Sequence, residues 1–453
     1  MAKLNTLSCW LLSLWMPLLA LGMPTARDSG PLYPVDDPFY VPPEGFASTA
    51  PGTILRHRTP PYPIAAFGLV PINLAASHQI LYRTTNSFGD AIATVSTILV
   101  PHNANFTKLL SYQVAEDAAD PNCSPSYGFQ LKSATDGILG LVMPQAEILW
   151  ITAALEKGWV VTVPDHLGPK SAFLANNLSG HATLDNIRAA LASSEFTNIT
   201  SDATVTMWGY SGGSLATGFA AELQPSYAPE LKLAGAALGG TVPKILPVIY
   251  SVNGGLFAGL APAGIQGLAN EYPSAVQLIE QNILPSKAAD FNKTRSLCLS
   301  GDIIEYFDLN IFTYFNNSSI FTEPIATALL DANAMGQHLP EIPLYIYKSV
   351  GDEVSPVNET DALVRQYYCP GGVSVEYKRD DLSDHVTMDI LGAPDAFMWL
   401  EDRMDGIPAS ANCSESTVLT SLTDPSVIAA LGADLVDVLL ELLSAPVGPT
   451  LSG

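Results

Sequence analysis

The stretch MWGYSGG at residues 207–213 limits the possible folds of this chain more than any other. Residues 203–208 form a short run rich in apolar and β-branched side chains, which is typical of a buried strand. Apolar residues then recur at helical spacing over 215–223. A strand, a sharp turn with the pattern G-x-S-x-G and a helix in this order predict an α/β protein with a serine at the edge of its sheet.

The residue types of this turn suit a nucleophilic serine. A serine hydroxyl is a poor nucleophile until a neighbouring base takes its proton. A strained turn after Tyr210 would lift Ser211 above the sheet, and Gly209 and Gly213 keep side chains out of the close contact between strand and helix. Gly212 leaves its backbone N–H open to a substrate oxyanion. The alternative interpretation is a glycine-rich turn that carries an ordinary serine.

Strands and helices alternate along the rest of the chain. Runs at 79–83 and 91–100 flank a polar turn and predict a β-hairpin. Further strands are predicted at 109–114, 159–163, 233–238, 343–349 and 373–378, and helices at 146–157, 183–192, 360–368 and 393–404. This alternation predicts an α/β fold with a mostly parallel central sheet.

The alternation stops over residues 241–340, which divides the predicted core into 61–240 and 341–425. This stretch contains helical pieces, prolines and glycines but few strand-like runs. Its nearly apolar run at 254–269 is interrupted by Pro262 and by glycines, so a membrane span is a poor interpretation. We expect a helical cap or lid over an apolar site. An ordinary buried helical insertion is the alternative.

The two ends of the chain have their own patterns. Residues 1–22 carry a basic start, an apolar run and small residues, which predict a signal peptide rather than a membrane anchor. Residues 23–60 are rich in Pro, Gly and Asp and predict an irregular N-terminal arm. Residues 426–453 predict an amphipathic helix and a tail. Because its polar face is acidic, we expect that helix to pack on the core, with a membrane-surface or partner role as the alternative.

Cysteines and glycosylation sequons agree with a secreted, extracellular protein. Removal of the leader leaves Cys123, Cys298, Cys369 and Cys413, an even number that predicts two disulfides. Three pairings are open; sequence order favours first with second and third with fourth without deciding it. Candidate glycosylated asparagines are Asn105, Asn177, Asn198, Asn292, Asn316, Asn317 and Asn358.

The charge and the missing motifs exclude several classes of function. The chain has 20 Lys and Arg against 44 Asp and Glu, a net charge of −24, which argues against nucleic acid and anionic membranes as partners. A lipid–water interface and an uncharged ester substrate stay compatible with it. No HExxH, zinc-spaced cluster, P-loop or GxGxxG occurs, so we expect no metal and no cofactor. We expect a monomer.

A serine, an acid and a histidine follow one another in the order that an α/β-hydrolase uses. These are Ser211, Asp352 directly after the strand at 343–349, and His385 after the strand at 373–378. In this arrangement His385 takes the serine proton and Asp352 orients the imidazole. Glu353 is an alternative acid, and Asp384 is a poor one because it neighbours His385 in sequence.

The loop after the strand at 109–114 holds Asp117, where this architecture usually supplies a second oxyanion donor. A solvated loop carboxylate is the alternative.

Several motifs together resemble the fungal secretory lipases of the lipase A type, over roughly residues 60–410. They are YQVAEDA at 112–118 followed by NC at 122–123, DHLG at 165–168, GYSGG at 209–213, GDE at 351–353 and DH at 384–385.

The resemblance implies an α/β-hydrolase core, a helical cap and ester hydrolysis. For the site it implies a triad of Ser211, Asp352 and His385, oxyanion donors at Asp117 and Gly212, and the disulfides Cys123–Cys298 and Cys369–Cys413. We therefore expect a secreted lipase that hydrolyses triacylglycerols or other apolar esters. A narrower esterase that deacetylates a secondary metabolite, such as a trichothecene-type intermediate, is the second hypothesis. A non-catalytic binding protein with a vestigial triad is the third.

Overall fold

The computed structural model describes residues 30–66, 68–133 and 147–421. The predicted signal peptide at 1–22 and the predicted C-terminal helix at 426–453 lie outside these residues. All elements below belong to the described part of the chain.

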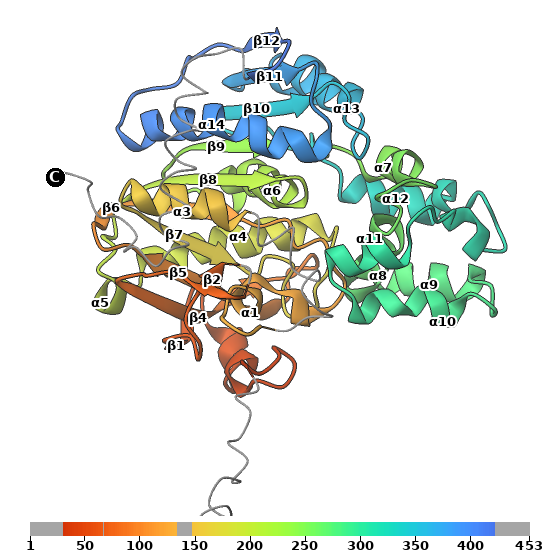
Figure 1. Cartoon of the computed structure of the whole chain (residues 1–453), viewed down its shortest axis with the longest axis horizontal. Helices are drawn as coiled ribbons and strands as arrows, with labels where there is room; N and C mark the ends of the chain where they lie inside the picture. Colours follow the sequence, from red (N-terminus) through yellow and green to blue (C-terminus); the bar gives the residue numbers. More distant parts are fainter. Residues whose placement is uncertain (1–29, 67, 134–146, 422–453) are drawn as a thin grey trace, which may run out of the picture. The chain divides into compact units, whose positions relative to one another are not determined.

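A sheet of 10 strands in the order β1-β4-β5-β7-β6-β8-β9-β10-β11-β12 forms the centre of the fold (Figure 1). The strands from β7 to β12 in this order pair in parallel, and β1, β4 and β5 pair antiparallel at one side. The sheet strands are β1 Ile54–Arg58, β4 Ala76–Thr85, β5 Ala91–Val100, β6 Asn105–Gln113, β7 Trp159–Pro164, β8 Thr204–Tyr210, β9 Leu233–Gly239, β10 Leu344–Ser349, β11 Val375–Asp380 and β12 Ser414–Val418. A separate pair is formed by β2 Ala65–Ala66 and β3 Val70–Pro71. This is the α/β-hydrolase fold that the sequence predicts.

Helices cover both faces of this sheet (Figure 1). The helices of the core are α1 Pro125–Gly128, α3 Ile148–Glu156, α4 Asn176–Leu191, α5 Ser194–Thr197, α6 Gly212–Tyr227, α13 Val357–Ala362 and α14 His385–Met404. Strand side chains point alternately to the two faces. In β10, for example, Leu344 and Ile346 join the core under α4 and α6, whereas Tyr345 and Tyr347 join the core under α3 and α14. Both faces of the sheet are therefore buried.

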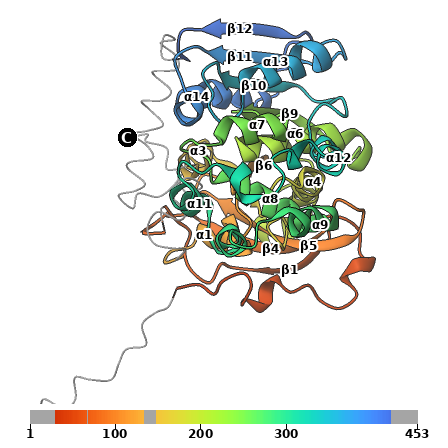
Figure 2. The same cartoon turned by 90° about the vertical axis from the view of Figure 1, so that its right-hand side faces the viewer.

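The stretch between β9 and β10 is helical and gathers at one end of the sheet (Figures 1 and 2). Its helices are α7 Ile245–Val252, α8 Leu260–Glu271, α9 Pro273–Asn282, α10 Ala288–Phe291, α11 Leu299–Glu305 and α12 Pro324–Ala332. These helices enclose an apolar core of their own, which includes Phe291, Phe315 and Phe321. Pro262 lies in the first turn of α8, where a missing N–H costs no helical hydrogen bond. We call residues 241–340 the cap.

Two disulfides fasten outlying segments to the core. Cys123, in the loop after β6, is bonded to Cys298 at the start of α11, so the cap is covalently tied to the sheet. Cys369 is bonded to Cys413, one residue before β12. These are the pairings that the family resemblance implies.

Two strands of the central sheet lie where the sequence predicts none, as do the short strands β2 and β3. Residues 54–58 fall in the predicted irregular arm but form β1, which pairs with β4 at the edge of the sheet. The strand at 373–378 is predicted to be the last, yet β12 follows it and pairs with β11. Both additions are largely polar strands at the outer edges of the sheet with no fully buried residue, so they lack the apolar pattern that marks a buried strand.

Three predicted helices have different limits in the structure. Helix α4 begins at Asn176 rather than at 183, and α13 runs on from residue 357 into a π-helical turn at Leu363–Tyr368. Helix α14 begins at His385 rather than at 393. Asp384 and Thr387 form a capping box that starts α14 early, and Pro394 is accommodated inside the helix. The predicted start at 393 is therefore eight residues too late.

Candidate active site

Ser211 occupies the turn between β8 and α6 in a strained backbone conformation, with φ 50° and ψ −119°. Glycines allow the close packing around this turn. A Cβ atom on Gly213 would lie 2.0 Å from the carbonyl oxygen of Gln113 in β6, and one on Gly209 would lie 2.3 Å from that of Gly213. Larger residues would separate the strand from the helix. The turn therefore has the geometry of a nucleophile elbow, in which strain is retained because it presents the serine.

Three side chains from separate loops form a chain of hydrogen bonds. The distance from Ser211 Oγ to His385 Nε2 is 2.8 Å. On the other side of the ring, His385 Nδ1 lies 2.7 Å from Asp352 Oδ2. Asp352 follows β10 and His385 opens α14, and both are buried. The structure thus brings together the serine, acid and histidine that the sequence order predicts.

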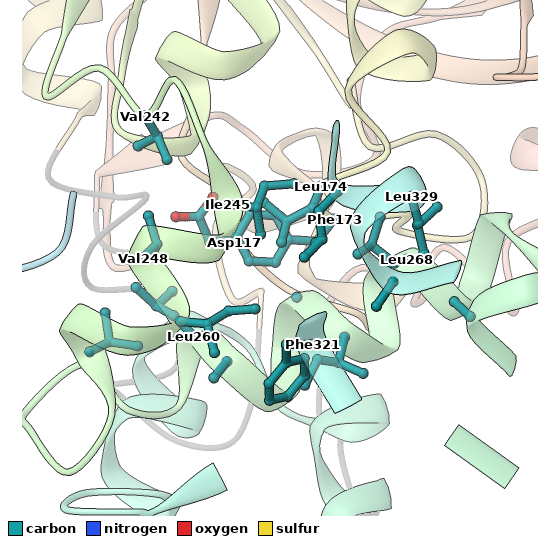
Figure 3. A pocket seen from close by; sticks show the side chains of 18 of the residues that line it. Asp117, Phe173, Leu174, Val242, Ile245, Val248, Leu260, Leu268, Phe321 and Leu329 are labelled. Atoms are coloured by element: carbon teal, nitrogen blue, oxygen red, sulfur yellow. The ribbon is translucent and has the colours of Figure 1, made fainter. Parts of the chain in front are cut away.

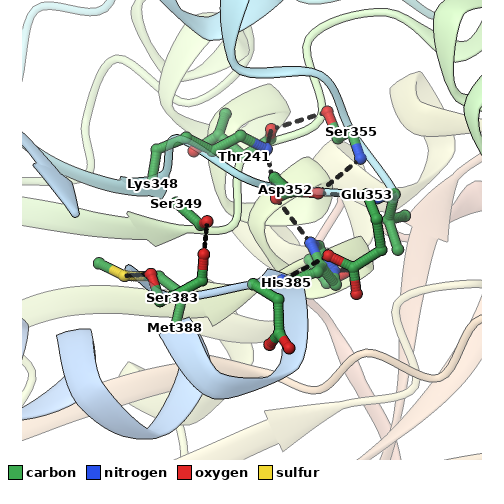
Figure 4. A network of polar contacts seen from close by, with 12 residues as sticks. Thr241, Lys348, Ser349, Asp352, Glu353, Ser355, Ser383, His385 and Met388 are labelled. Atoms are coloured by element: carbon green, nitrogen blue, oxygen red, sulfur yellow. Dashed lines mark hydrogen bonds and ion pairs between the residues drawn. The ribbon is translucent and has the colours of Figure 1, made fainter. Parts of the chain in front are cut away.

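Asp352 is held from several directions (Figure 4). Its Oδ1 accepts hydrogen bonds from the backbone N–H groups of Val354 and Ser355, at 2.9 and 2.7 Å. Its Oδ2 also accepts one from Lys348 Nζ, at 2.8 Å. Burial alone would raise the pKa of Asp352, but the charges of His385 and Lys348 and their hydrogen bonds lower it below its usual range. The carboxylate stays charged beside the imidazole.

Lys348 is a residue of this hydrogen-bonded cluster that sequence reasoning missed. Its side chain is fully buried, and its ammonium also donates to the carbonyl oxygen of Thr241, at 2.8 Å. Burial lowers the pKa of Lys348, and Asp352 opposes that shift. The available signal was a lone lysine inside the apolar strand at 343–349, four positions before the acid.

The two alternative acids have other partners. Glu353 Oε2 accepts the backbone N–H of His385 at 2.9 Å, and Asp384 caps α14 by accepting the N–H of Thr387 at 2.7 Å. Tyr210 donates its hydroxyl hydrogen to the carbonyl oxygen of His385. These contacts fix the backbone that carries the imidazole, whereas Asp352 contacts the ring itself.

Asp117 lies against the start of α6. Its backbone is left-handed, with φ 42°, and its side chain is buried. A Cβ atom on Gly212 would lie 1.7 Å from Asp117 Oδ1, so the two residues are in direct contact. Gly212 is the first residue of α6, and N–H groups of a first turn have no partner within their own helix. Burial raises the pKa of Asp117 to about 7, with the charge of His385 opposing the shift.

An apolar cavity extends from Ser211 into the cap, with about 910 Å³ of empty space when the open solvent at its mouth is included. Asp117 and Ser211 are the polar side chains in its wall, and nearly all of the remainder are aliphatic or aromatic. Figure 3 shows these side chains around the cavity, among them Phe173, Leu268 and Phe321. Most of the apolar wall comes from α7, α8, α9 and α12.

Comparison with known proteins agrees with this geometry. Residues 133–412 match the secretory lipase family. Lipase A of Arthroderma benhamiae is 49% identical over 438 residues, which are 96% of this chain and 93% of that protein. Lipase 1 of Candida albicans is 37% identical over 92% of this chain and 90% of that protein.

The chain belongs to the secretory lipase family. Among solved structures, Candida antarctica lipase A in its closed state is similar, with a TM-score of 0.80, 30% identity, and coverage of 93% of this chain and 100% of that one. Family membership makes the chain an ester hydrolase.

In this secretory lipase, the motif DHLG supports the loop that carries Asp117. His166 donates from Nε2 to the carbonyl oxygen of Val114 at 2.8 Å, and burial lowers the pKa of His166 to about 4. Asp165 accepts hydrogen bonds from the backbone N–H and the hydroxyl of Ser126. Burial raises the pKa of Asp165 to about 7, with those two bonds opposing the shift. His166 is therefore a structural histidine.

Further features bear on the partners of this secretory lipase. Among the described residues, no group of His, Cys, Asp and Glu has the arrangement of a metal site, and no helix is both long and apolar enough to span a bilayer. The predicted glycosylation sequons differ in exposure. Asn105, Asn198, Asn292, Asn316 and Asn358 are exposed, whereas Asn177 and Asn317 are partly buried and donate to Ala332 and Glu323.

Proposed function

We propose that this chain is a secreted serine lipase that hydrolyses triacylglycerols or other apolar esters. One observation carries the proposal. The hydrogen bonds from Asp352 through His385 lead to Ser211, and Ser211 lies in the wall of an otherwise apolar cavity that runs into the cap.

The proposed reaction has two halves. His385 Nε2 takes the proton of Ser211 as the serine oxygen attacks the ester carbon, and the N–H groups of Gly212 and Asp117 stabilise the oxyanion. His385 then gives that proton to the alcohol oxygen, the carbon–oxygen bond of the ester breaks, and an acyl-enzyme remains. Water, activated by the same histidine, releases the acid. Asp352 stabilises the imidazolium in both halves.

The acyl class follows from the cavity. Each methylene buried from water contributes about 0.8 kcal/mol, so a long chain that fills this apolar space gains more than an acetyl group. The apolar wall of the cavity therefore favours a long acyl chain over an acetyl group and disfavours the metabolite deacetylase. A non-catalytic binding protein would not require a serine, an imidazole and a carboxylate within hydrogen-bonding distance of one another.

The remaining predictions complete the proposal. We propose that the cap acts as a lid at a lipid–water interface and that the protein acts outside the cell as a monomer. The disulfides and the five exposed sequons suit an extracellular surface.

The test compares the mature protein with Ser211→Ala on octanoyl and acetyl esters of one alcohol. We expect faster release of octanoate, and a loss of about 10⁴-fold or more in kcat in the variant. Release of acetate alone would favour the deacetylase. Equal rates for the two proteins would contradict the serine mechanism.

A further inference from the structure

A second cavity, with about 500 Å³ of empty space including open solvent, adjoins Ser211 on the side of the imidazole. Both cavities are lined by Asp117 and Ser211, but only the second is lined by His385. In the proposed mechanism the alcohol oxygen receives its proton from His385 Nε2, so the alcohol part of the ester must lie within reach of that ring. The position of His385 therefore assigns the acyl chain to the first cavity and the alcohol to the second.

The wall of the second cavity is apolar except for a few side chains. Phe257, Leu299, Ile303 and Val386 are typical of its lining. Three of its polar residues are Asp117, Ser211 and His385, and the hydroxyl of Tyr210 is engaged with the backbone of His385. Two carboxyl groups remain, those of Glu147 and Asp389. Carboxyl groups in an otherwise apolar wall require hydrogen-bond partners.

The two carboxyl groups differ in the hydrogen bonds that they accept. Glu147 lies at the start of α3, is only 3% exposed, and accepts the backbone N–H of Ala115 at 2.8 Å. It also accepts the hydroxyl of Tyr112 at 3.3 Å. Asp389, in the second turn of α14, has a buried Oδ1 with no hydrogen-bond partner in the described part of the chain. That oxygen is an unused acceptor in the wall of the cavity.

The protonation of the pair adds donors to these acceptors. Burial raises the pKa of Asp389 to about 7, opposed by the charge of His385 and a hydrogen bond from Trp150. Burial and the charge of Asp389 raise the pKa of Glu147 well above its usual value. Near neutral pH the pair therefore retains at least one proton and offers both a donor and an acceptor.

We propose that this cavity binds the alcohol part of the ester, and that Glu147 and Asp389 select alcohols that carry a further free hydroxyl group. Partial acylglycerols and other polyol esters belong to this class. A hydroxyl donates one hydrogen bond and accepts others, so it matches a carboxyl pair in either protonation state. An alkyl group would leave a buried carboxyl oxygen unpaired, and sites built to bind a hydroxyl reject such analogues strongly. The inference rests on the proposed serine mechanism.

The experiment uses two esters with the same acyl chain, 2,3-dihydroxypropyl octanoate and butyl octanoate. We expect the mature protein to prefer the dihydroxypropyl ester by about tenfold or more in kcat/KM. In Asp389→Leu the ratio should fall by at least about fivefold, because the unused acceptor is gone. Asp389→Asn keeps an acceptor and a donor of the same shape and should retain most of the ratio. Leu329→Ala widens only the acyl cavity and should change both rates alike.

Each outcome decides one of the two proposals. A wild-type ratio of one or less overturns the alcohol site, so a leucine variant that fails to fold still leaves the test in place. An unchanged ratio in a folded Asp389→Leu also overturns it. In both cases octanoate release that depends on Ser211 would leave the serine mechanism intact, whereas release that persists in Ser211→Ala would overturn that mechanism instead.

Discussion

The ammonium of Lys348 and the carboxylate of Asp352 form an ion pair, 2.8 Å long, in which both side chains are completely shielded from water. Lys348 contacts the same oxygen that accepts the Nδ1–H of His385. It therefore balances the charge of the acid without touching the serine. We regard it as a residue that positions Asp352 and keeps it ionised.

Lys348→Met should raise the pKa of Asp352, because one of the charges that lowers it is removed. A protonated Asp352 cannot stabilise the imidazolium. The acid limb of the pH–activity profile should therefore move to higher pH, with about tenfold lower kcat at pH 5 relative to pH 8. Removing the ammonium from this buried ion pair should also lower the free energy of unfolding by about 3 kcal/mol, since His385 and two backbone N–H groups still contact Asp352.

Lys378→Met is the matched control for that variant. Lys378 lies on the neighbouring strand β11 and pairs with Asp395 at 2.5 Å, away from the imidazole. If both lysine variants keep the wild-type pH profile, Lys348 has no role in holding the acid ionised.

The proposed catalytic residues were easier to predict from the sequence than the residues that surround them. Ser211, Asp352 and His385 each follow a strand with a clear local pattern, so each loop could be predicted from its own stretch of sequence. Glu147 and Asp389 contact residues far away in the chain, and no local pattern marks such contacts. Lys348 lies only four residues before Asp352, but burial of its ammonium depends on the distant carbonyl oxygen of Thr241.

The secondary structure was also predicted well in some parts of the fold and missed in others. Strands such as β7 and β10 are buried along their whole length and mostly apolar, and they were predicted within about two residues, which is the usual error at element ends. The edge strands β1 and β12 are largely polar, and backbone pairing with a neighbour defines them. The cap was predicted only from the loss of the strand–helix alternation, because its helices are short and irregular.

The alkaline side of the pH profile should depend on Asp117. Its raised pKa, about 7, leaves the carboxyl neutral in weak acid and negative above neutrality. A negative charge beside Gly212 would oppose the oxyanion, so kcat should fall as pH rises through 7. Asp117→Asn should lack that loss, as measured with an octanoyl ester from pH 5 to 9. Asp90→Asn, in an exposed turn, is the control, and an unchanged alkaline limb in Asp117→Asn would contradict the assignment.

Acyl selectivity should respond to the bulk of the cavity wall. Leu268, on α8, is buried and lines the acyl cavity. Leu268→Trp should lower kcat/KM for octanoyl esters by about tenfold or more and change that for acetyl esters less, because the larger ring occupies the space of the distal methylenes. The ratio of the two rates is the measurement. Tyr250→Trp, half exposed on α7, controls for a general effect of tryptophan on the cap. An equal loss on both esters would contradict a role of this cavity in acyl binding.

Removal of each disulfide should destabilise a different part of the protein, the cap in one case and the sheet edge at β12 in the other. In the chain-entropy description, loops of 175 and 44 residues correspond to about 5 and about 4 kcal/mol of stabilisation. Cys123→Ser with Cys298→Ser should speed proteolysis within the cap and lower octanoyl hydrolysis. Cys369→Ser with Cys413→Ser should loosen the edge at β12 and leave the cap protected. Limited proteolysis with mass analysis of the fragments distinguishes them, and identical cleavage patterns would count against a tethered cap.

The cap leaves the sheet after β9 and returns to it at β10, and it supplies most of the wall of the proposed acyl cavity. Ser211, Asp352 and His385 lie outside the cap, each shortly after a strand of the sheet. Substitutions over 242–330 can therefore change which acyl chain the protein prefers without moving the groups proposed to transfer the proton. A lineage of such enzymes, or a mutant library directed at this one insertion, can diversify its preference among acids while the reacting atoms keep their distances.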